Sequence, residues 1–423
     1  MRTKKALIAC LTVAVCLSSL VFAGCGKKGW VTTDEGTFYY EHGEAYAGLK
    51  VMPDGTVRYF DPVTFAMATG EQEIDGNRYY FDGSGVMQTG FQTTDGITKY
   101  YNPESGILMT GWLELEEGKK YYSDPATGAV SMGLTVIEGR QYFFDQTSGV
   151  MQTGWVELGE DTYYFEEETG AGKDGIFEID GAKYGFMGGL MVKNHRALAD
   201  KHLYYFGGDG KVTREIDGTK PMVAVTYDDG PSQYTDSILD TFEEYGQKCT
   251  FFIVGDRINW NEDVTRREAE LGMEQGSHTY SHDRLTSLGS DGQTETLNKM
   301  AAELERVTGN APTCLRPPEG RFDDNLKEVC KTLEYPIVLW SIDSEDWKSR
   351  NADTVCSRII GKVKDGDIIL CHDLYASTAE ATKRFVPALV EAGFQLVTVE
   401  ELGLLKTSGG LENGVVYYSV GQT

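Results

Sequence analysis

The chain has 423 residues, which predicts two or three domains, and its 40% hydrophobic and 11% aromatic content is typical of folded protein. Its formal net charge of −26 argues against binding nucleic acid, because contacts to the phosphate backbone require clustered Lys and Arg. The same charge disfavours direct adhesion to an anionic membrane surface and favours solubility outside the cell.

The first 25 residues have the pattern of an export signal. A basic start that includes Arg2 precedes an almost entirely apolar run over residues 6–23, and Cys25 follows Gly24. The end of this run resembles a bacterial lipobox, which implies that Cys25 is lipidated and anchors the protein to the outer face of the cytoplasmic membrane. Because Phe22 stands where Leu is typical, ordinary signal cleavage and an uncleaved anchor remain alternatives. We therefore expect an exported protein, at the cell surface or extracellular.

The chain has eight cysteines, three of them in the export segment. The other five are an odd number and show no metal-ligand spacing such as Cys-x-x-Cys. Most of them lie in apolar runs, where a buried free thiol is the commoner state. We predict no disulfide framework for these five residues, which are Cys249, Cys314, Cys330, Cys356 and Cys371.

Between residues 36 and 213 an aromatic pair returns about every 21 residues, as in Tyr80-Phe81 and Tyr100-Tyr101. Most pairs are followed by Asp or Asn, then Gly, then an apolar residue, and residues 85–91 and 149–155 are nearly the same phrase. A fixed period of this size indicates a repeat array in which each unit contributes one short hairpin. Because one hairpin cannot bury its own apolar face, we expect the units to stack into a solenoid.

The repeats resemble the choline-binding and glucan-binding type of cell-wall repeat, and residues 74–81 (Ile-Asp-Gly-Asn-Arg-Tyr-Tyr-Phe) are typical of it. The resemblance implies a choline-type ligand or a wall glycan, held between consecutive repeats by stacked aromatic rings. Trp is rarer here than in choline-binding repeats, and the alternative is that the rings only form the core of the solenoid. The candidate ligand-binding rings follow a Gly or stand in equivalent places, and they are Phe91, Trp112, Trp155 and Phe177.

Between residues 218 and 406 short apolar runs alternate with amphipathic segments. The apolar runs are rich in β-branched residues and predict buried parallel strands at 222–227, 250–254, 337–342, 368–371 and 395–399. The amphipathic segments predict helices at 236–245, 264–271, 294–307, 325–333, 352–363 and 378–392. This alternation predicts an α/β sheet or barrel, in which chemistry gathers at the carboxyl ends of the strands. No role is predicted for the tail, residues 407–423.

Five polar clusters lie at or near the ends of these strands. The first holds two adjacent carboxylates, Asp228 and Asp229, which are costly to bury together unless a cation or a division of roles separates them. The second places His278 and His282 four residues apart, a spacing that can put both imidazoles on one face of a helical turn. Either pattern alone is more often incidental than functional. The chain has only six His, however, and three of them, His278, His282 and His372, lie at predicted strand ends of this region. This concentration favours metal binding.

The other three clusters add a cation, further carboxylates and a third imidazole. Arg316 precedes two prolines, which present its guanidinium rigidly for bracing a carboxylate. Residues 340–347 hold several carboxylates between two tryptophans, and an apolar run delivers His372 at its end. Each of these clusters is also compatible with an ordinary surface turn, so the signal lies in their combination.

Together and in order, the five clusters resemble those of the NodB-like polysaccharide deacetylases, carbohydrate esterase family four, over about residues 221–405. The resemblance implies an irregular (β/α) barrel, usually of seven strands, that removes N-acetyl groups from amino sugars of a polysaccharide. It implies that Asp229, His278 and His282 bind the metal and that Asp228 is the general base. It further implies that Arg316 orients the base, that His372 is the general acid and that Asp343 is the partner of His372. The residues that it implies for the substrate pocket are Tyr227, Pro317, Pro318, Glu319, Trp347 and Leu370.

The implied chemistry follows from the low reactivity of an amide. A divalent metal polarises the carbonyl and lowers the pKa of a bound water from about 15.7 toward about 7. One carboxylate and two imidazoles leave coordination positions open for water and substrate. Zinc is the expected metal, and cobalt, nickel or iron also suit an Asp-His-His set. A separate base must then take the proton of the water, and an acid must protonate the leaving amine.

Three functions remain open at this point. The leading prediction is N-deacetylation of cell-wall peptidoglycan, with the repeats holding the protein at its substrate. One alternative is another acetylated polymer, such as chitin-like oligomers or O-acetylated xylan, and the other is a catalytically inert wall-binding adhesin. Glu319 stands where the family usually has Tyr or Phe, yet every expected catalytic position is filled, which favours an active enzyme.

Overall fold

The computed structural model describes residues 26–116 and 118–421, so the export segment with Cys25 lies outside the described residues. The chain divides into two compact units. The first comprises the residues up to 173 together with 188–190, and the second comprises 174–187 and the residues from 191 onward. Among the described residues, no helix is both long enough and apolar enough to span a membrane.

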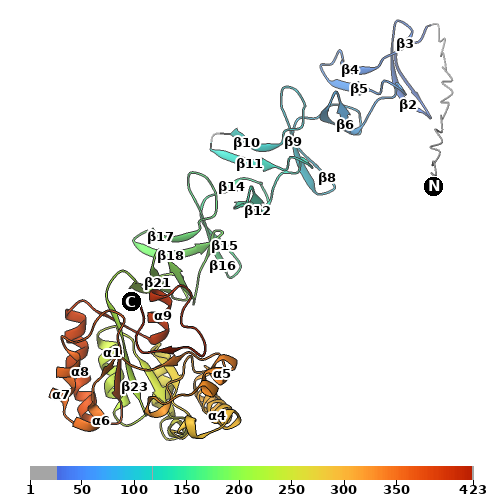
Figure 1. Cartoon of the computed structure of the whole chain (residues 1–423). Helices are drawn as coiled ribbons and strands as arrows, with labels where there is room; N and C mark the ends of the chain where they lie inside the picture. The colour runs from blue at the N-terminus through green and yellow to red at the C-terminus, as the bar shows by residue number, and fades with distance from the viewer. Residues whose placement is uncertain (1–25, 117, 422–423) are drawn as a thin grey trace, which may run out of the picture. The chain divides into compact units, whose positions relative to one another are not determined.

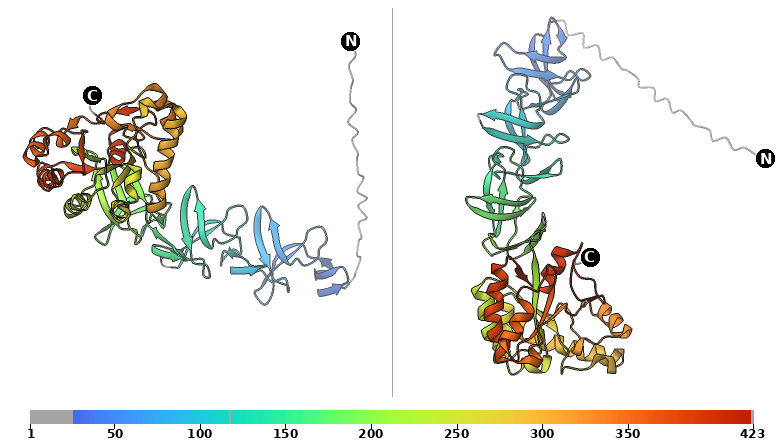
Figure 2. Two further views of the ribbon diagram at one scale, coloured as in Figure 1. Left: turned by 90° about the horizontal axis from the view of Figure 1, so that it is seen from below. Right: turned by 60° about the vertical axis from the view of Figure 1, so that its left-hand side comes forward.

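The first unit is a series of short antiparallel hairpins that follow one another in chain order (Figure 2). This arrangement confirms the prediction of hairpin repeats. The strands are β1 (Gly29–Thr33), β2 (Gly36–Glu41), β3 (Glu44–Ala45), β4 (Gly48–Val51), β5 (Val57–Phe60), β6 (Gly70–Ile74), β7 (Asn77–Phe81), β8 (Gly90–Thr94), β9 (Ile97–Tyr101), β10 (Gly111–Glu116), β11 (Lys119–Ser123), β12 (Gly133–Ile137), β13 (Arg140–Phe144), β14 (Met151–Gln152), β15 (Gly154–Leu158), β16 (Asp161–Phe165) and, where the units change over in the sequence, β19 (Leu190–Met191).

The hairpin turns follow from the local sequence. In the hairpin of β6 and β7, Ile74 pairs with Asn77, and the two residues between them, Asp75 and Gly76, have φ angles of 51° and 77°. A type I′ turn requires a positive φ at both central residues, which Asp tolerates and Gly adopts freely. The Asp-Gly pair therefore closes a two-residue hairpin and sets the register of its strands.

Consecutive hairpins are also joined to one another. The Met87 amide donates a hydrogen bond of 2.7 Å to the Val57 carbonyl of the preceding hairpin. Just before Met87, Gly85 has a φ of 77°, and a Cβ at this position would come within 2.4 Å of the Met67 sulfur. The Gly of the repeated phrase is therefore required both by its backbone conformation and by the close approach of the neighbouring repeat.

The second unit contains the remaining hairpins and the α/β region. Its strands are β17 (Gly175–Ile179), β18 (Ala182–Met187), β20 (Arg196–Ala199), β21 (His202–Phe206), β22 (Val212–Asp217), β23 (Met222–Asp228), β24 (Thr250–Ile253), β25 (Glu274–Ser277), β26 (Ile337–Val338), β27 (Ile342–Asp343), β28 (Ile368–His372), β29 (Gln395–Val397) and β30 (Val416–Tyr417). Its helices are α1 (Thr235–Glu244), α2 (Gly255–Ile258), α3 (Glu262–Glu270), α4 (Ser290–Thr308), α5 (Asp324–Thr332), α6 (Asp346–Ser349), α7 (Ala352–Ile359), α8 (Ala376–Glu391) and α9 (Val399–Lys406), with 3-10 turns at Leu285–Ser287 and Pro318–Gly320.

Parallel strands form the centre of this unit, and helices flank them (Figure 1). The strand order is β25-β24-β23-β28-β27, and β29 also pairs with the first half of β23. Isolated parallel bridges run from Ser277 through Leu315 to Ile337 and so continue the pairing to β26, which also pairs with β30 of the tail. The predicted alternation of strands and helices is confirmed, except that residues 337–342 form two short strands instead of one.

The two faces of β23 lie in different environments. Val225 and Tyr227 belong to the apolar cluster formed with α1 and α8, whereas Ala224 belongs to a second cluster on the other side. Because alternate side chains of a strand point to opposite faces, Asp228 lies on the same face as Ala224. The central strand thus carries its terminal carboxylate away from helices α1 and α8.

The five cysteines of the described region are buried free thiols in this unit. Burial raises the pKa of every one of them, because a thiolate loses its hydration in an apolar core. They are therefore packing residues, which agrees with the prediction that they form no disulfide framework.

The last repeat strands, β20 to β22, pack on the α/β region. Arg214 of β22 and Tyr205 of β21 both donate to the Glu401 carboxylate of α9, which is only 3% exposed. Arg196 of β20 donates through both Nη groups to the Glu400 carboxylate. These ion pairs explain why the last hairpins, expected as part of the repeat region, belong to the same compact unit as the α/β strands.

Candidate metal centre and active site

Asp228 and Asp229 end the central strand and face different partners. Asp228 is the last residue of β23, and Asp229 has a φ of 72°, in the left-handed region that residues other than Gly rarely adopt. Arg257 donates a hydrogen bond from Nη1 to the Asp229 carbonyl and so holds this turn of the backbone. The strand therefore delivers two adjacent carboxylates into separate environments.

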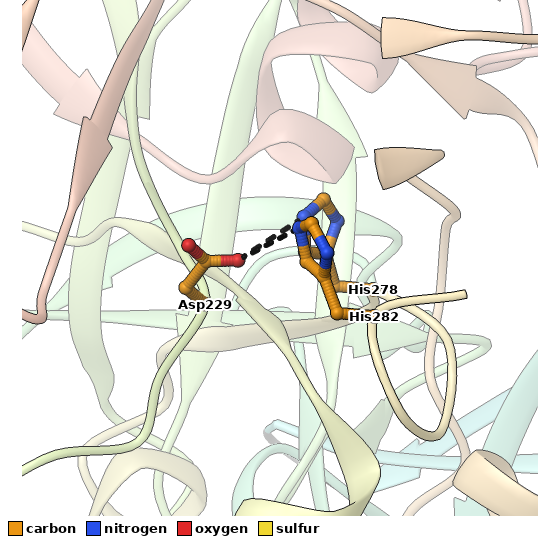
Figure 3. A group of neighbouring side chains, drawn as sticks. All are labelled: Asp229, His278 and His282. Atoms are coloured by element: carbon orange, nitrogen blue, oxygen red, sulfur yellow. Dashed lines mark ion pairs between the residues drawn. The ribbon is translucent and has the colours of Figure 1, made fainter. Parts of the chain in front are cut away.

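Asp229, His278 and His282 converge on one point (Figure 3). Asp229 Oδ1 lies 3.5 Å from His278 Nε2 and 3.3 Å from His282 Nε2, and the possible ligand atoms all lie within 4.8 Å of one another. His278 follows β25 directly, and the loop after it turns through left-handed residues at Thr279 and His282. The two imidazoles thus meet through a tightly turned loop and not, as the spacing suggested, on a helical turn.

This set of donors fits a divalent metal. Asp229 Oδ1 is buried without a hydrogen-bond partner, which is costly for a carboxylate oxygen unless a cation satisfies it. His278 Nδ1 lies 2.7 Å from the Arg316 carbonyl, which directs Nε2 toward Asp229. Burial lowers the pKa of His278 to about 3, so this imidazole is neutral, as a metal ligand must be. His282 is 40% exposed, which leaves one side of the triad open to water and substrate.

Asp228 lies beside the triad and is held by Arg316. Arg316 Nη1 donates to Asp228 Oδ1 at 2.7 Å, and Asp228 Oδ2 lies 3.9 Å from His278 Nε2. Burial raises the pKa of Asp228, although the charges of Arg316 and His372 oppose the rise. A raised pKa makes the carboxylate a stronger proton acceptor, which is the property required of a general base.

The Arg316 side chain is wholly buried and fixed at several points. Its Nε donates to the Val338 carbonyl at 3.1 Å, and its Nη2 donates to the Leu339 carbonyl at 2.9 Å. The guanidinium carbon also lies 4.0 Å from the centroid of the Phe252 ring. Because the planar guanidinium cannot rotate without breaking these contacts, it presents Nη1 to Asp228 in a fixed geometry.

His372 ends β28, and the register of the sheet places it opposite Asp228. Its carboxylate partner is Asp346, because His372 Nδ1 lies 2.8 Å from Asp346 Oδ1 and its amide donates to Asp346 Oδ2 at 2.7 Å. The expectation that Asp343 pairs with His372 is therefore wrong. Asp343 Oδ1 instead accepts a hydrogen bond from the Glu345 amide, while Asp346 reaches the imidazole from the start of α6.

The partner of His372 determines its charge. Burial by itself lowers the pKa of His372, but the hydrogen bond and charge of Asp346, with the charges of Asp228 and Asp229, raise it to about 9. Burial also raises the pKa of Asp346, yet hydrogen bonds from His372 and Thr378 bring it below its usual value. His372 is therefore cationic at neutral pH and can donate a proton.

Tyr227 is not a substrate-pocket residue, contrary to the expectation from the resemblance. Its side chain is wholly buried, and its ring stacks on Phe251 with the centroids 5.5 Å apart. Its hydroxyl lies 2.8 Å from Thr382 Oγ1 of α8. The side chain points to the helices because Tyr227 alternates with Asp228 along the strand.

The other predicted pocket residues lie around the carboxyl ends of the strands. Leu370 is buried, two residues before His372, and so on the same face of β28. Trp347 follows Asp346 and is 48% exposed. Both prolines of the third cluster are buried, and Glu319 after them receives two hydrogen bonds from Arg284 at 2.8 and 2.9 Å. That ion pair ties the third cluster to the loop that carries the histidines.

The candidate ligand-binding rings of the repeats lie at the surface. Phe91, Trp112 and Trp155 are 43%, 45% and 39% exposed, and Phe177 is half-buried. Trp112 lines a recess of about 400 Å³, where its ring centroid lies 5.0 Å from that of Tyr142. Their exposed area makes these rings accessible to a ligand, and the contacts of Trp112 with Tyr122 and Tyr142 show that such a ring also packs against its own and the neighbouring hairpin.

Sequence reasoning missed two residues at these sites. Asp346 stands in the fourth cluster beside Trp347, but the sequence contains no signal that separates it from Asp343. Trp30 is 46% exposed and lines a recess of about 440 Å³ in the first hairpins. Trp30 precedes its aromatic pair by the same spacing as Trp112 does, a repeat signal that identifies it in hindsight.

Comparison with known proteins agrees with this geometry. The chain matches the family of polysaccharide deacetylases over residues 215–338 and the family of choline-binding repeats over residues 68–111 and 131–177. A peptidoglycan-N-acetylglucosamine deacetylase of Bacillus cereus is 32% identical over 199 residues, which cover 46% of this chain and 93% of that protein. The chain therefore belongs to the polysaccharide deacetylase family, and both resemblances seen in the sequence are confirmed.

Two longer relatives carry the same region. The peptidoglycan-N-acetylmuramic acid deacetylase PdaC of Bacillus subtilis is 35% identical over 192 residues, covering 45% of this chain and 40% of that protein. The peptidoglycan-N-acetylglucosamine deacetylase PgdA of Listeria monocytogenes is 36% identical over 185 residues, covering 44% and 39%. The chain thus spans about two-fifths of the length of these relatives. A solved structure of PdaC is 35% identical and covers 45% of this chain and 94% of that chain, with a TM-score of 0.44.

Proposed function

We propose that this protein is a metal-dependent N-deacetylase that removes acetyl groups from amino sugars of cell-wall peptidoglycan. The observation that supports this most strongly is the convergence of Asp229, His278 and His282 beside a buried carboxylate, Asp228, whose neighbour on the next strand is the cationic imidazole of His372. The activities named for relatives of the α/β region, which act on peptidoglycan N-acetylglucosamine or N-acetylmuramic acid, support the same substrate class. We further propose that its parallel strands form the irregular seven-strand barrel that the resemblance implies.

Asp228 is the general base in this proposal. Its raised pKa suits it to accept a proton from the water that attacks the acetamido carbonyl. Arg316 keeps the carboxylate in place, because Nη1 holds Oδ1 and leaves Oδ2 directed toward the histidine side of the site. A divalent ion held by Asp229, His278 and His282 would polarise the carbonyl and acidify the water, and zinc is the expected ion, with cobalt, nickel or iron as alternatives.

His372 is the general acid. Its Nδ1 is engaged by Asp346, so Nε2 is the atom that carries the proton to the leaving amine. An amine leaves only when it is protonated, and a group whose pKa is about 9 retains its proton at neutral pH. The products are acetate and a glycan with one free amino group.

The repeats hold the enzyme at its substrate in this proposal. Their ligand is a wall glycan or a choline-type group, bound at exposed rings such as Trp112. Residues 36–213 form the wall-binding region and 218–406 the catalytic region. Export, and lipid anchoring through Cys25 at the outer face of the cytoplasmic membrane, remain predictions from the sequence.

Acetate release from peptidoglycan strands and from N-acetylglucosamine oligomers tests the proposal. We expect release that a chelator abolishes and an added divalent metal restores. Asp229→Ala should lose bound metal and turnover together, whereas Asp228→Asn should retain metal, measured by elemental analysis, and lose turnover. Normal turnover by Asp228→Asn would show that the base is assigned wrongly. No acetate from either substrate with any divalent metal would favour the inert adhesin.

A further inference from the structure

Arg350 has no carboxylate partner in the part of the chain that the structure describes. It follows α6 directly, with a φ of 48°, and its Nε donates to the Trp347 carbonyl at 2.9 Å. Its guanidinium carbon lies 3.4 Å from the centroid of the Tyr375 ring. A backbone carbonyl and an aromatic face therefore hold the guanidinium in place, and neither neutralises its charge.

The same segment supplies the partner of the general acid. Asp346 begins α6 and pairs with His372, while Arg350 directly follows the last residue of the same short helix. The Tyr375 ring centroid lies 6.2 Å from that of His372. The Tyr375 ring is therefore in contact with Arg350 and close to the imidazole of the general acid. The Arg350–Tyr375 pair thus borders the side of the site from which the amine leaves.

In lacking a carboxylate partner, Arg350 differs from the other exposed arginines of the α/β region that the structure describes. Other exposed arginines of the α/β region pair with a carboxylate, as Arg358 does with Glu345 and Arg384 with Asp353. Its Nε is occupied and its guanidinium carbon lies over the Tyr375 ring, which leaves the two Nη groups of Arg350 to match the two oxygens of a carboxylate. The pair is therefore prearranged to bind an anionic group.

We propose that Arg350, oriented by Tyr375, binds a carboxylate of the glycan close to the acetamido group that is hydrolysed. The inference rests on the proposed function and names the feature by which the site selects its substrate. Chitin-like oligomers carry no carboxylate, whereas the muramic acid of peptidoglycan carries a lactyl ether on C3, next to the carbon that bears the acetamido group. The carboxylate is that of the lactyl group or one from an attached stem peptide.

Matched substrates isolate this contact. The full chain is assayed on peptide-free glycan strands with free lactyl carboxylates, on the same strands after conversion of the carboxylates to methylamides, and on strands with stem peptides attached. The readout is the ratio of kcat/KM between charged and methylamidated strands. We expect a ratio of about ten for the unmodified protein, falling as ionic strength rises, because charge-assisted hydrogen bonds at an exposed site are screened by salt.

Variants then assign the ratio to Arg350. Arg350→Gln should bring the ratio of kcat/KM to about one. Arg350→Lys should give an intermediate ratio, because Lys keeps the positive charge and lacks the two Nη donors that bind both oxygens of a carboxylate. Arg384→Gln is the control, because it removes an equal charge from an arginine of α8 that already pairs with Asp353. This variant should keep the ratio of the unmodified protein. A preference for strands with stem peptides over strands with free lactyl groups would assign the carboxylate to the peptide.

Two results would overturn the proposal: an unmodified protein that distinguishes none of the three kinds of strand, or an Arg350→Gln variant that keeps the preference of the unmodified protein for strands that carry a carboxylate. Binding of the charged and the methylamidated strands, measured by calorimetry, keeps this test independent of turnover. Weaker binding of the charged strand by Arg350→Gln supports the contact even if no acetate is released, whereas absent acetate release alone contradicts only the deacetylase proposal.

Discussion

His372 and Asp346 are joined at two points, since one carboxylate oxygen lies 2.8 Å from the imidazole Nδ1 and the other accepts from the His372 amide at 2.7 Å. A carboxylate attached to both the ring and the backbone fixes the orientation of the ring as well as its charge. The same carboxylate also accepts from Thr378, so the backbone of His372 and the Thr378 hydroxyl hold Asp346 in the position from which it orients the ring.

Asp346→Asn should therefore shift the pH dependence of the reaction. The pKa of His372 is raised to about 9, so its acidic form is present below that value and is lost as the pH rises through it. Without the Asp346 carboxylate the pKa falls, and the alkaline limb of kcat/KM should move to lower pH with at least a tenfold loss of kcat at pH 8. Acetate release measured from pH 6 to 10 tests this.

Asp343→Asn is the matched control for that experiment. Because Asp343 accepts only a local amide hydrogen bond from Glu345, its variant should keep the alkaline limb in place. A shifted limb in Asp343→Asn, with none in Asp346→Asn, would restore the partner that the sequence suggested.

The position of a deletion should decide whether the catalytic region folds. Removing residues 36–173 should leave an enzyme that releases acetate from short oligomers and binds walls more weakly. A deletion through residue 217 also removes Arg214 and Tyr205, the partners of the Glu401 carboxylate. It removes with them Leu203 and Ile216, which pack in the same apolar cluster as Leu402. Breaking a buried ion pair costs about 3–5 kcal/mol, so we expect a much lower midpoint of thermal unfolding.

Arg214→Ala in the full chain separates the ion pair from the rest of the deleted segment. It should lower the unfolding free energy by several kcal/mol, measured by denaturant titration, while wall binding stays unchanged. Equal stability of the shorter and the longer deletion would show that the last hairpins contribute nothing to the α/β unit.

Trp112→Ala should weaken attachment to purified cell walls roughly fivefold, measured by co-sedimentation, because an exposed ring that stacks on a ligand contributes about 1 kcal/mol. Val136→Ala is the control, since Val136 is 69% exposed in a neighbouring repeat. Neither change should affect acetate release from short oligomers. Competition by free choline or by soluble glycan distinguishes the two ligand types, and undiminished attachment of Trp112→Ala would remove this ring from the binding surface.

Tyr227→Phe should lower stability without affecting the reaction. The change removes one buried hydrogen bond to Thr382, which still donates to the Thr378 carbonyl, so the loss should be about 1 kcal/mol by denaturant titration. Values of kcat and KM should stay within error of the unmodified protein. A lower kcat/KM at unchanged stability would return Tyr227 to the substrate pocket.

Most elements of the α/β region could be predicted because their local patterns are strong. β23 and β28 are apolar, β-branched runs, and the helices have clear amphipathic periods. The strand that leads to His278 was missed, because β25 reads Glu-Gln-Gly-Ser and yet is wholly buried. Glu274 is satisfied there by Thr250 and Thr313, partners from distant segments that no local pattern reveals.

By itself, the sequence determined the type of site: two adjacent carboxylates, two spaced histidines, an arginine and a third histidine, in an order specific enough to identify the family. Those properties depend on residue type and spacing along one chain. Only the tertiary structure decided that Asp346 is the partner of His372 and that Tyr227 faces the core. The reason is physical, since the direction of a side chain and its distance from another segment are set by how strands and helices pack together.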